Sequence, residues 1–188
     1  MLFILTGVMQ TGKTRWLERL IERVRESDLP VYGVVAPGQW IDHGANAPVG
    51  QRFEKLGIDN ILLPQNERIA FARRPDLVEQ DCEGSDADNG SKNALMRCSQ
   101  STQAKLSWAI DDFAIDQVNA HFCTLCAQAK DCTLPEDIKH ATGITVQAPT
   151  HPGLLVIDEL GPLELLKNGG LTSAMDVLSQ GPSPLCAH

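Results

Sequence analysis

An eight-residue pattern near the N-terminus constrains this chain more than any other feature. Residues 7–14 read Gly-Val-Met-Gln-Thr-Gly-Lys-Thr and match G-x-x-x-x-G-K-[ST] at every fixed position. Gly7 lets the chain turn sharply after a strand, and Gly12 lets the backbone come close to a phosphate. The N–H groups from about Met9 to Thr14 then point into one concavity at a helix N-terminus, which suits a β-phosphate. The pattern predicts a phosphate-binding loop.

The segments on both sides of this loop have the expected character. Residues 2–6 form a short apolar run, which predicts a strand buried on both faces of a parallel sheet. Residues 12–26 carry apolar side chains at three-to-four spacing, which predicts an amphipathic helix. Residues 31–36, Val-Tyr-Gly-Val-Val-Ala, are expected to form a second strand. Together they predict a right-handed strand–helix–strand unit.

A second apolar run delivers two acids. Residues 154–157 predict another doubly buried strand, and Asp158 and Glu159 follow at its carboxyl end. Ligands bind at that end of the strands in open α/β sheets, so both acids are expected beside the phosphate loop. In this arrangement Thr14 and Asp158 would hold Mg²⁺, and Glu159 would orient or deprotonate an attacking water. Such a run alone also fits an edge strand that meets solvent.

The rest of the chain completes an α/β pattern. Short alternating runs within residues 37–70 predict a small antiparallel patch, and the polar residues 81–104 predict a solvated loop. Helices are expected from residue 111 to about 130 and from 171 to 178. We expect a single domain over 1–188: a three-layer α/β fold with a mostly parallel sheet and a polar, cysteine-bearing insertion at about 76–135. Because only a short apolar stretch follows the last helix, we expect the natural C-terminus to lie beyond this chain.

Composition excludes several classes of partner. Sixteen Lys and Arg against 24 Asp and Glu give a net charge of −8, which argues against nucleic acid and anionic membranes. No apolar run approaches the roughly 18 residues of a membrane span, and no signal peptide precedes the first apolar run. A soluble cytoplasmic protein is therefore expected. Composition says nothing about its oligomeric state.

Two motifs together resemble a known family. The segment 156–165, Val-Ile-Asp-Glu-Leu-Gly-Pro-Leu-Glu-Leu, resembles the extended Walker B segment of small P-loop nucleoside-triphosphatases found in thermophiles and, in vertebrates, as cancer-related nucleoside-triphosphatase. The N-terminal phosphate loop, the strand at 31–36 and the glycine pair after Lys167 are also similar. The resemblance covers about residues 1–36 and 152–180. The distance from Lys13 to Asp158 is longer than in the family, and the family continues past the glycine pair with further strands.

This resemblance implies a P-loop NTPase fold and slow, Mg²⁺-dependent hydrolysis of ATP, GTP and other nucleoside triphosphates to diphosphate and phosphate. Lys13 and Glu159 take the catalytic roles by this resemblance, and Glu164 matches a later glutamate whose role is left open. The metal would be held by Thr14 and Asp158. The nucleotide-binding residues would be Gly7, Val8, Met9, Gln10, Thr11, Gly12, Lys13 and Thr14.

Six cysteines in a chain without a signal peptide are expected to be reduced thiols. Cys123, Cys126 and Cys132 have a spacing that could bind Zn²⁺ or an iron–sulfur cluster, although no second C-x-x-C pair accompanies them. Cysteine is also a common small core residue. These residues leave open a nucleotide-binding module with a metal site and little turnover.

A small-molecule kinase is a third alternative. It would need an arginine-rich lid, and residues 101–188 contain no arginine. Trp40 and Trp108 could stack on a nucleobase or serve as packing anchors. Base preference and the source of any positive charge for the transition state are not determined by the sequence.

Overall fold

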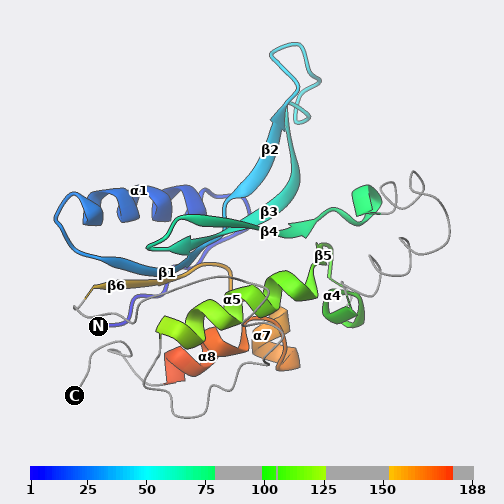
Figure 1. Ribbon diagram of the computed structural model, residues 1–188. Coiled ribbons are helices and arrows are strands. Elements are labelled where there is room, and N and C mark those ends of the chain that lie inside the picture. The colour runs from blue at the N-terminus through cyan, green and yellow to red at the C-terminus, as the bar shows by residue number, and fades with distance from the viewer. Residues whose placement is uncertain (79–98, 105, 126–152, 180–188) are drawn as a thin grey trace, which may run out of the picture.

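The computed structural model describes residues 1–78, 99–104, 106–125 and 153–179. These segments contain both helices and strands and form an α/β arrangement (Figure 1). The elements are α1 (Lys13–Arg25), β1 (Val31–Val35), β2 (Gly38–Asp42), β3 (Phe53–Leu63), β4 (Glu67–Arg73), α4 (Ser99–Gln103), β5 (Ala109–Ile110), α5 (Asp112–Leu125), β6 (Leu154–Ile157), α7 (Pro162–Lys167) and α8 (Thr172–Ser179).

The strands form one mixed six-stranded sheet. Its order is β5-β4-β3-β1-β6, and β2 pairs with β3 beside this path. Among the described strands only β1 and β6 run parallel, while β1–β3, β2–β3, β3–β4 and β4–β5 are antiparallel. The prediction of a mostly parallel sheet is therefore wrong. Antiparallel neighbours such as β3 and β4 need only a tight turn, whereas each parallel pair needs a long crossover connection.

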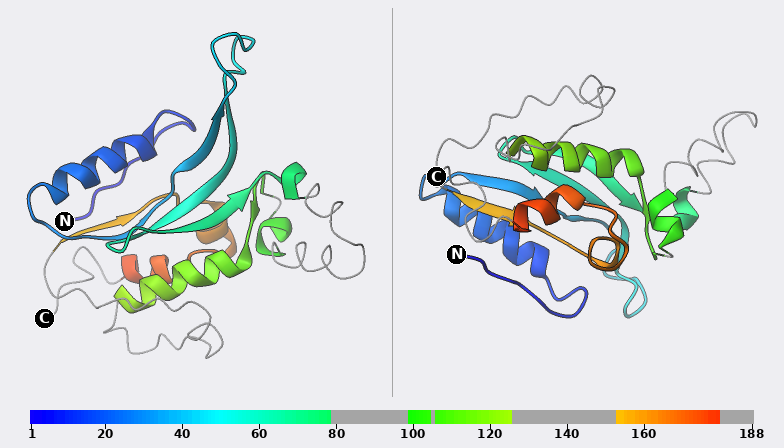
Figure 2. Two further views of the ribbon diagram at one scale, coloured as in Figure 1. Left: turned by 45° about the horizontal axis from the view of Figure 1, so that its top comes forward. Right: turned by 90° about the horizontal axis from the view of Figure 1, so that it is seen from below.

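Helices cover both faces of the sheet (Figures 1 and 2). On one face the apolar stripe of α1 packs on a cluster that contains Ile21, Val31, Val35, Leu63 and Val156. On the other face α5 and α8 enclose a larger cluster, with Tyr32, Val34, Leu62, Ile69, Ala114, Val118, Phe122, Leu125, Leu171, Ala174 and Val177 at its centre. Strand β1 contributes alternate residues to both clusters, because successive side chains of a strand point to opposite faces.

Most elements expected from the sequence are confirmed. Helix α1, strand β1 and strand β6 lie at the predicted positions, and α8 begins and ends within one residue of its prediction. The expected antiparallel patch corresponds to β2, β3 and β4, although β3 is one long strand. Helix α5 is described as far as Leu125. The short helices α4 and α7 were not expected from the sequence.

The N-terminal apolar run is a second correction. Residues 2–6 form no strand, and their side chains are exposed. Both edges of β1 are already hydrogen-bonded, to β3 on one side and to β6 on the other. Residues 1–8 instead run outside the sheet, alongside α1 (Figure 2). The predicted strand–helix–strand unit is therefore not formed, and β1 has β6 as its parallel partner.

The expected insertion at about 76–135 falls partly outside the described residues. The part that is described contains α4, β5 and α5, and α5 belongs to the main core rather than to an appendage. The C-terminal stretch after residue 179 also lies outside the described residues. Within the described part of the chain, no helix has both the length and the apolar character needed to cross a membrane.

Candidate functional site

The loop between residues 7 and 12 has an irregular backbone with left-handed residues. Gln10 and Gly12 adopt positive φ angles of 61° and 88°, and such alternation of backbone hand turns successive N–H groups toward one side. Gly12 is the N-cap of α1, and no side chain caps this end. The first turn of α1 also carries no acid. The N–H groups and the positive dipole end of α1 are thus open to an anionic ligand.

Lys13 lies folded over this loop. Its Nζ donates hydrogen bonds to the carbonyl oxygens of Gly7, at 3.0 Å, and Val8, at 2.8 Å. The Thr11 hydroxyl also donates to Val8 O, at 2.9 Å. All three contacts lie at the protein surface. A bound phosphate could therefore take the Lys13 ammonium from the two carbonyl groups without disturbing a buried interaction.

Asp158 lies where β6 ends beside β1. Its backbone N–H continues the ladder to Val34 O, and its carboxylate accepts a hydrogen bond of 3.1 Å from Ala36 N. Burial raises the pKa of Asp158 above its ordinary value. The N–H of Ala36, a hydrogen bond from the Thr14 side chain and the charge of Lys13 act in the opposite direction. The structure thus brings Lys13, Thr14 and Asp158 together, as the two motifs predict.

Glu159 has an unusual backbone. Its φ is 63°, in the left-handed region that non-glycine residues seldom occupy. Its side chain is exposed, yet the surrounding protein removes enough water to raise the pKa of its carboxyl group. The charge of Asp158 raises the pKa further, whereas Lys55 and Lys13 lower it. Strained residues concentrate at functional sites, because the surrounding structure must enforce the geometry.

Glu164 fixes the turn that follows the two acids. Its side chain is buried, with 8% of its surface exposed, and its two oxygens accept separate backbone hydrogen bonds. Gly161 N donates to Oε2 at 2.8 Å, and Leu171 N donates to Oε1 at 3.0 Å. A Cβ at Gly170 would lie 2.1 Å from Glu164 Oε1, so the glycine pair allows this close approach. Glu164 therefore has a structural part in holding residues 161–171.

Two groups near the acids were missed by the sequence analysis. The Ala36 N–H carries no side-chain signal, and Lys55 stands in an alternating strand segment where a lysine usually marks a solvated face. Trp108 anchors Lys55: the Lys55 ammonium lies 5.2 Å from the centroid of the Trp108 ring. Trp108 itself packs against a small cluster around Ala36 and Ile58. No pattern in the sequence pairs these positions.

Of the three cysteines predicted to bind a metal, Cys123 lies in the described part of the chain. Cys123 is disulfide-bonded, so the expectation of a reduced thiol is wrong at this position. In this state its sulfur accepts a contact from the Ser173 hydroxyl at 3.3 Å and is not a free thiolate ligand. Cys126 and Cys132 lie outside the described residues. In the segments that the structure describes, no three His, Cys, Asp or Glu side chains gather as a metal site.

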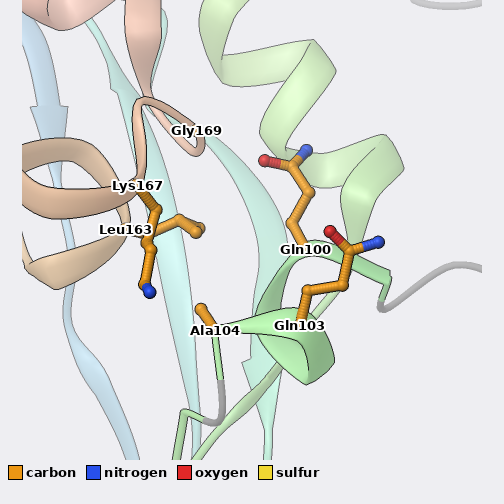
Figure 3. A pocket seen from close by; sticks show the side chains of 6 residues that line it. All are labelled: Gln100, Gln103, Ala104, Leu163, Lys167 and Gly169. Carbon is orange, nitrogen blue, oxygen red and sulfur yellow. The ribbon is translucent and has the colours of Figure 1, made fainter.

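A separate hollow lies between α4 and α7 (Figure 3). It has a volume of about 310 Å³, and neither residues 7–14 nor Asp158 and Glu159 line it. Gln100, at its rim, accepts a hydrogen bond of 2.9 Å from Gly170 N. The lining residues are Gln100, Gln103, Ala104, Leu163, Lys167 and Gly169.

Comparison with known proteins adds no relative: no family model, curated protein or solved structure matches this chain.

Proposed function

We propose that this protein is a Mg²⁺-dependent nucleoside-triphosphatase that hydrolyses ATP, GTP and related nucleotides to the diphosphate and phosphate. One observation carries the proposal: Thr14 and Lys13 of a G-x-x-x-x-G-K-T loop interact with Asp158, although the two motifs are far apart in the sequence. The resemblance of both motifs to the small P-loop nucleoside-triphosphatases supports the same activity.

A protein with a net negative charge needs local positive groups to bind a polyanion. The net charge of −8 repels a triphosphate at long range. The uncapped N-terminus of α1, the loop N–H groups and the Lys13 ammonium offset this repulsion over a short distance. Lys13 exchanges its two carbonyl partners for phosphate oxygens when nucleotide binds. These groups contact the phosphates and not the base, which agrees with the hydrolysis of nucleotides with different bases.

The donor set fits Mg²⁺. This ion prefers oxygen ligands and is usually held by one or two protein groups together with substrate phosphates. The Thr14 side chain and the Asp158 carboxylate interact, so both oxygens are available to one ion. Mg²⁺ bound there would supply neutralisation of the phosphate charge. Burial destabilises the Asp158 carboxylate and so raises its pKa. A cation bound beside the carboxylate would offset this destabilisation.

Hydrolysis requires a water in line with the terminal phosphorus. Glu159 is exposed and adjacent to Asp158, so its carboxylate can accept a hydrogen bond from that water. As the water oxygen bonds to phosphorus, Glu159 takes the proton, and the bond from phosphorus to the β–γ bridging oxygen breaks. The electron pair leaves with the diphosphate. Raised pKa values are common for groups with this task, because a base must also release its proton.

Phosphate release by the purified protein tests the proposal. Lys13→Ala removes the phosphate contact, and Glu159→Gln removes the base while it keeps the shape of the side chain. We expect Glu159→Gln to lower kcat by about 100-fold or more, with little change in nucleotide affinity. Arg19→Ala is the matched control, because it removes an exposed cation from the same helix away from the loop. Nucleotide binding without release above the Lys13→Ala level would refute hydrolysis and leave a binding module.

A further inference from the structure

Lys55 is a half-buried cation at the base of an extended arm. We define the arm as β2, residues 43–52 and the first residues of β3, which project together from the body of the protein (Figure 1). Lys55 pairs with Trp40 of β2, and the end of its side chain lies near Gly38: a Cβ at Gly38 would stand 2.7 Å from Lys55 Cε. A side chain there would displace the lysine. Gly38 therefore makes room for Lys55 at this place.

The ammonium of Lys55 is held by an aromatic face. It lies 5.2 Å from the centroid of the Trp108 ring, in cation–π geometry. Trp108 is itself fixed by packing against Ala36 and its neighbours in the small cluster. A flexible lysine side chain normally samples many conformations, and the ring restricts it. Trp108 thus orients a positive charge.

Trp108, which holds this charge, packs in the same small cluster as Ala36, next to the acidic pair. Strand β2 begins two residues after Ala36, whose N–H binds the Asp158 carboxylate, so the base of the arm adjoins the end of β6. Residues 7–12 pass beside the base of the arm in every view (Figures 1 and 2). The positive charge of Lys55 also acts on the Glu159 carboxylate. Lys55 therefore belongs to the surroundings of the phosphate loop.

Lys55 differs from the other cations of this region in its partners. Arg52 pairs with Asp42, Arg68 with Asp59 and Arg74 with Glu54. Within the described residues, no carboxylate lies at ion-pair distance from Lys55. An oriented cation without an ion-pair partner, next to an anion-binding loop, is suited to a ligand charge.

We propose that Lys55 is a catalytic residue that contacts the terminal phosphoryl group of the bound nucleotide and stabilises the charge that develops as this group is transferred to water. The inference rests on the nucleoside-triphosphatase function proposed above. Lys55 moves no proton: the water proton goes to Glu159 and the diphosphate leaves with the electron pair of the broken bond. The lysine supplies the role that an arginine has in many related reactions.

The proposed contact of Lys55 should stabilise the transition state and leave the binding of the ground-state nucleotide unchanged. Lys55→Gln should lower kcat for ATP with Mg²⁺ by about 100-fold or more, while KM changes little. The same substitution should weaken binding of ADP with aluminium fluoride, which imitates the phosphoryl group in transit, and leave ADP binding unchanged. Lys55→Arg, which keeps the charge, should restore part of the rate. Arg52→Gln is the control, because it removes a cation from the same arm that is already paired with Asp42.

Trp108→Leu provides a second test. It should lower kcat less than Lys55→Gln, and the double variant should be no slower than Lys55→Gln alone, because both changes remove one oriented charge. An active wild-type protein with unchanged kcat in Lys55→Gln would overturn the inference alone. Equal losses in ADP and ADP–aluminium fluoride binding would overturn it as well, since Lys55 would then act on the ground state. A wild-type protein that releases no phosphate would refute the proposed function itself.

Discussion

His121 makes the stability of this protein depend on pH in a way that can be calculated. The residue lies on α5 with 1% of its surface exposed, and its Nε2 lies 3.1 Å from the carbonyl oxygen of Gly33. A carbonyl only accepts, so Nε2 carries the proton in the neutral ring. Nδ1 is buried and has no hydrogen-bond partner in the described part of the structure. Protonation would therefore bury a positive charge.

The cost follows from the pKa. Burial lowers the pKa of His121 from 6.5 to about 4, while the backbone of Gly33 and Leu63 acts in the opposite direction. The unfolded chain binds a proton near pH 6.5 and the folded chain does not, so stability is full above 6.5 and is lost as the pH falls toward 4. The full pKa difference between the unfolded and the folded chain corresponds to about 3 kcal/mol of stability. About 2 kcal/mol of this stability is lost between pH 7 and 5.

Urea denaturation at several pH values measures this dependence. His121→Gln keeps a donor for Gly33 O but cannot be protonated, so the wild-type protein should lose about 2 kcal/mol more than this variant between pH 7 and 5. Phe122→Leu is the control: it alters the neighbouring, fully buried side chain on α5 and should lower stability by the same amount at each pH. If the wild-type protein and His121→Gln lost stability in parallel, the reasoning from burial would be refuted.

Two further substitutions test the backbone and the buried acid. Gly33→Ala should lower the free energy of unfolding by more than about 3 kcal/mol, because φ is 102° and the new Cβ would stand 2.0 Å from Val156 O in the parallel pair; an unchanged urea midpoint would contradict this. Asp158→Asn should raise the melting temperature of the metal-free protein at pH 7, because a raised pKa means that the folded state disfavours the carboxylate. That gain should shrink as the pH falls toward 3.8, where the wild-type carboxyl group is protonated in both states; a lower melting temperature at pH 7 would show that the hydrogen bonds from Thr14 and Ala36 outweigh burial.

Elements with a strong local pattern were predictable. The stripe of apolar residues in α1 and the apolar run of β6 specify their structure within a few residues, because periodicity and burial agree there. The glycines of residues 7–12 also act locally, since a glycine such as Gly12 adopts a positive φ readily. The rule about the carboxyl ends of parallel strands predicted Asp158 beside Thr14, but residues 2–6 form no strand, so only the tertiary structure explains this placement.

Strand pairing was not predictable in this way. An apolar run such as residues 2–6 fits the interior of a sheet, yet the edges of β1 were taken by β3 and β6, and the run remained exposed. Competition between strands for one edge depends on the whole chain. Similarly, nothing near Lys55 in the sequence indicates that Trp108 will hold it, because the contact joins residues that only the fold of the sheet brings together.

The amino-acid sequence by itself determined which chemical groups are at hand: a glycine-containing loop, a lysine and a hydroxyl after it, and two carboxylates at the end of an apolar strand. The tertiary structure alone decided which groups face one another, including the Ala36 N–H on Asp158 and the Lys55 charge near Glu159. The physical reason is the separation along the chain over which each kind of interaction acts. Backbone conformation and periodicity act over a few neighbouring residues, whereas hydrogen bonds, burial and charge act between whatever residues the folded chain places together.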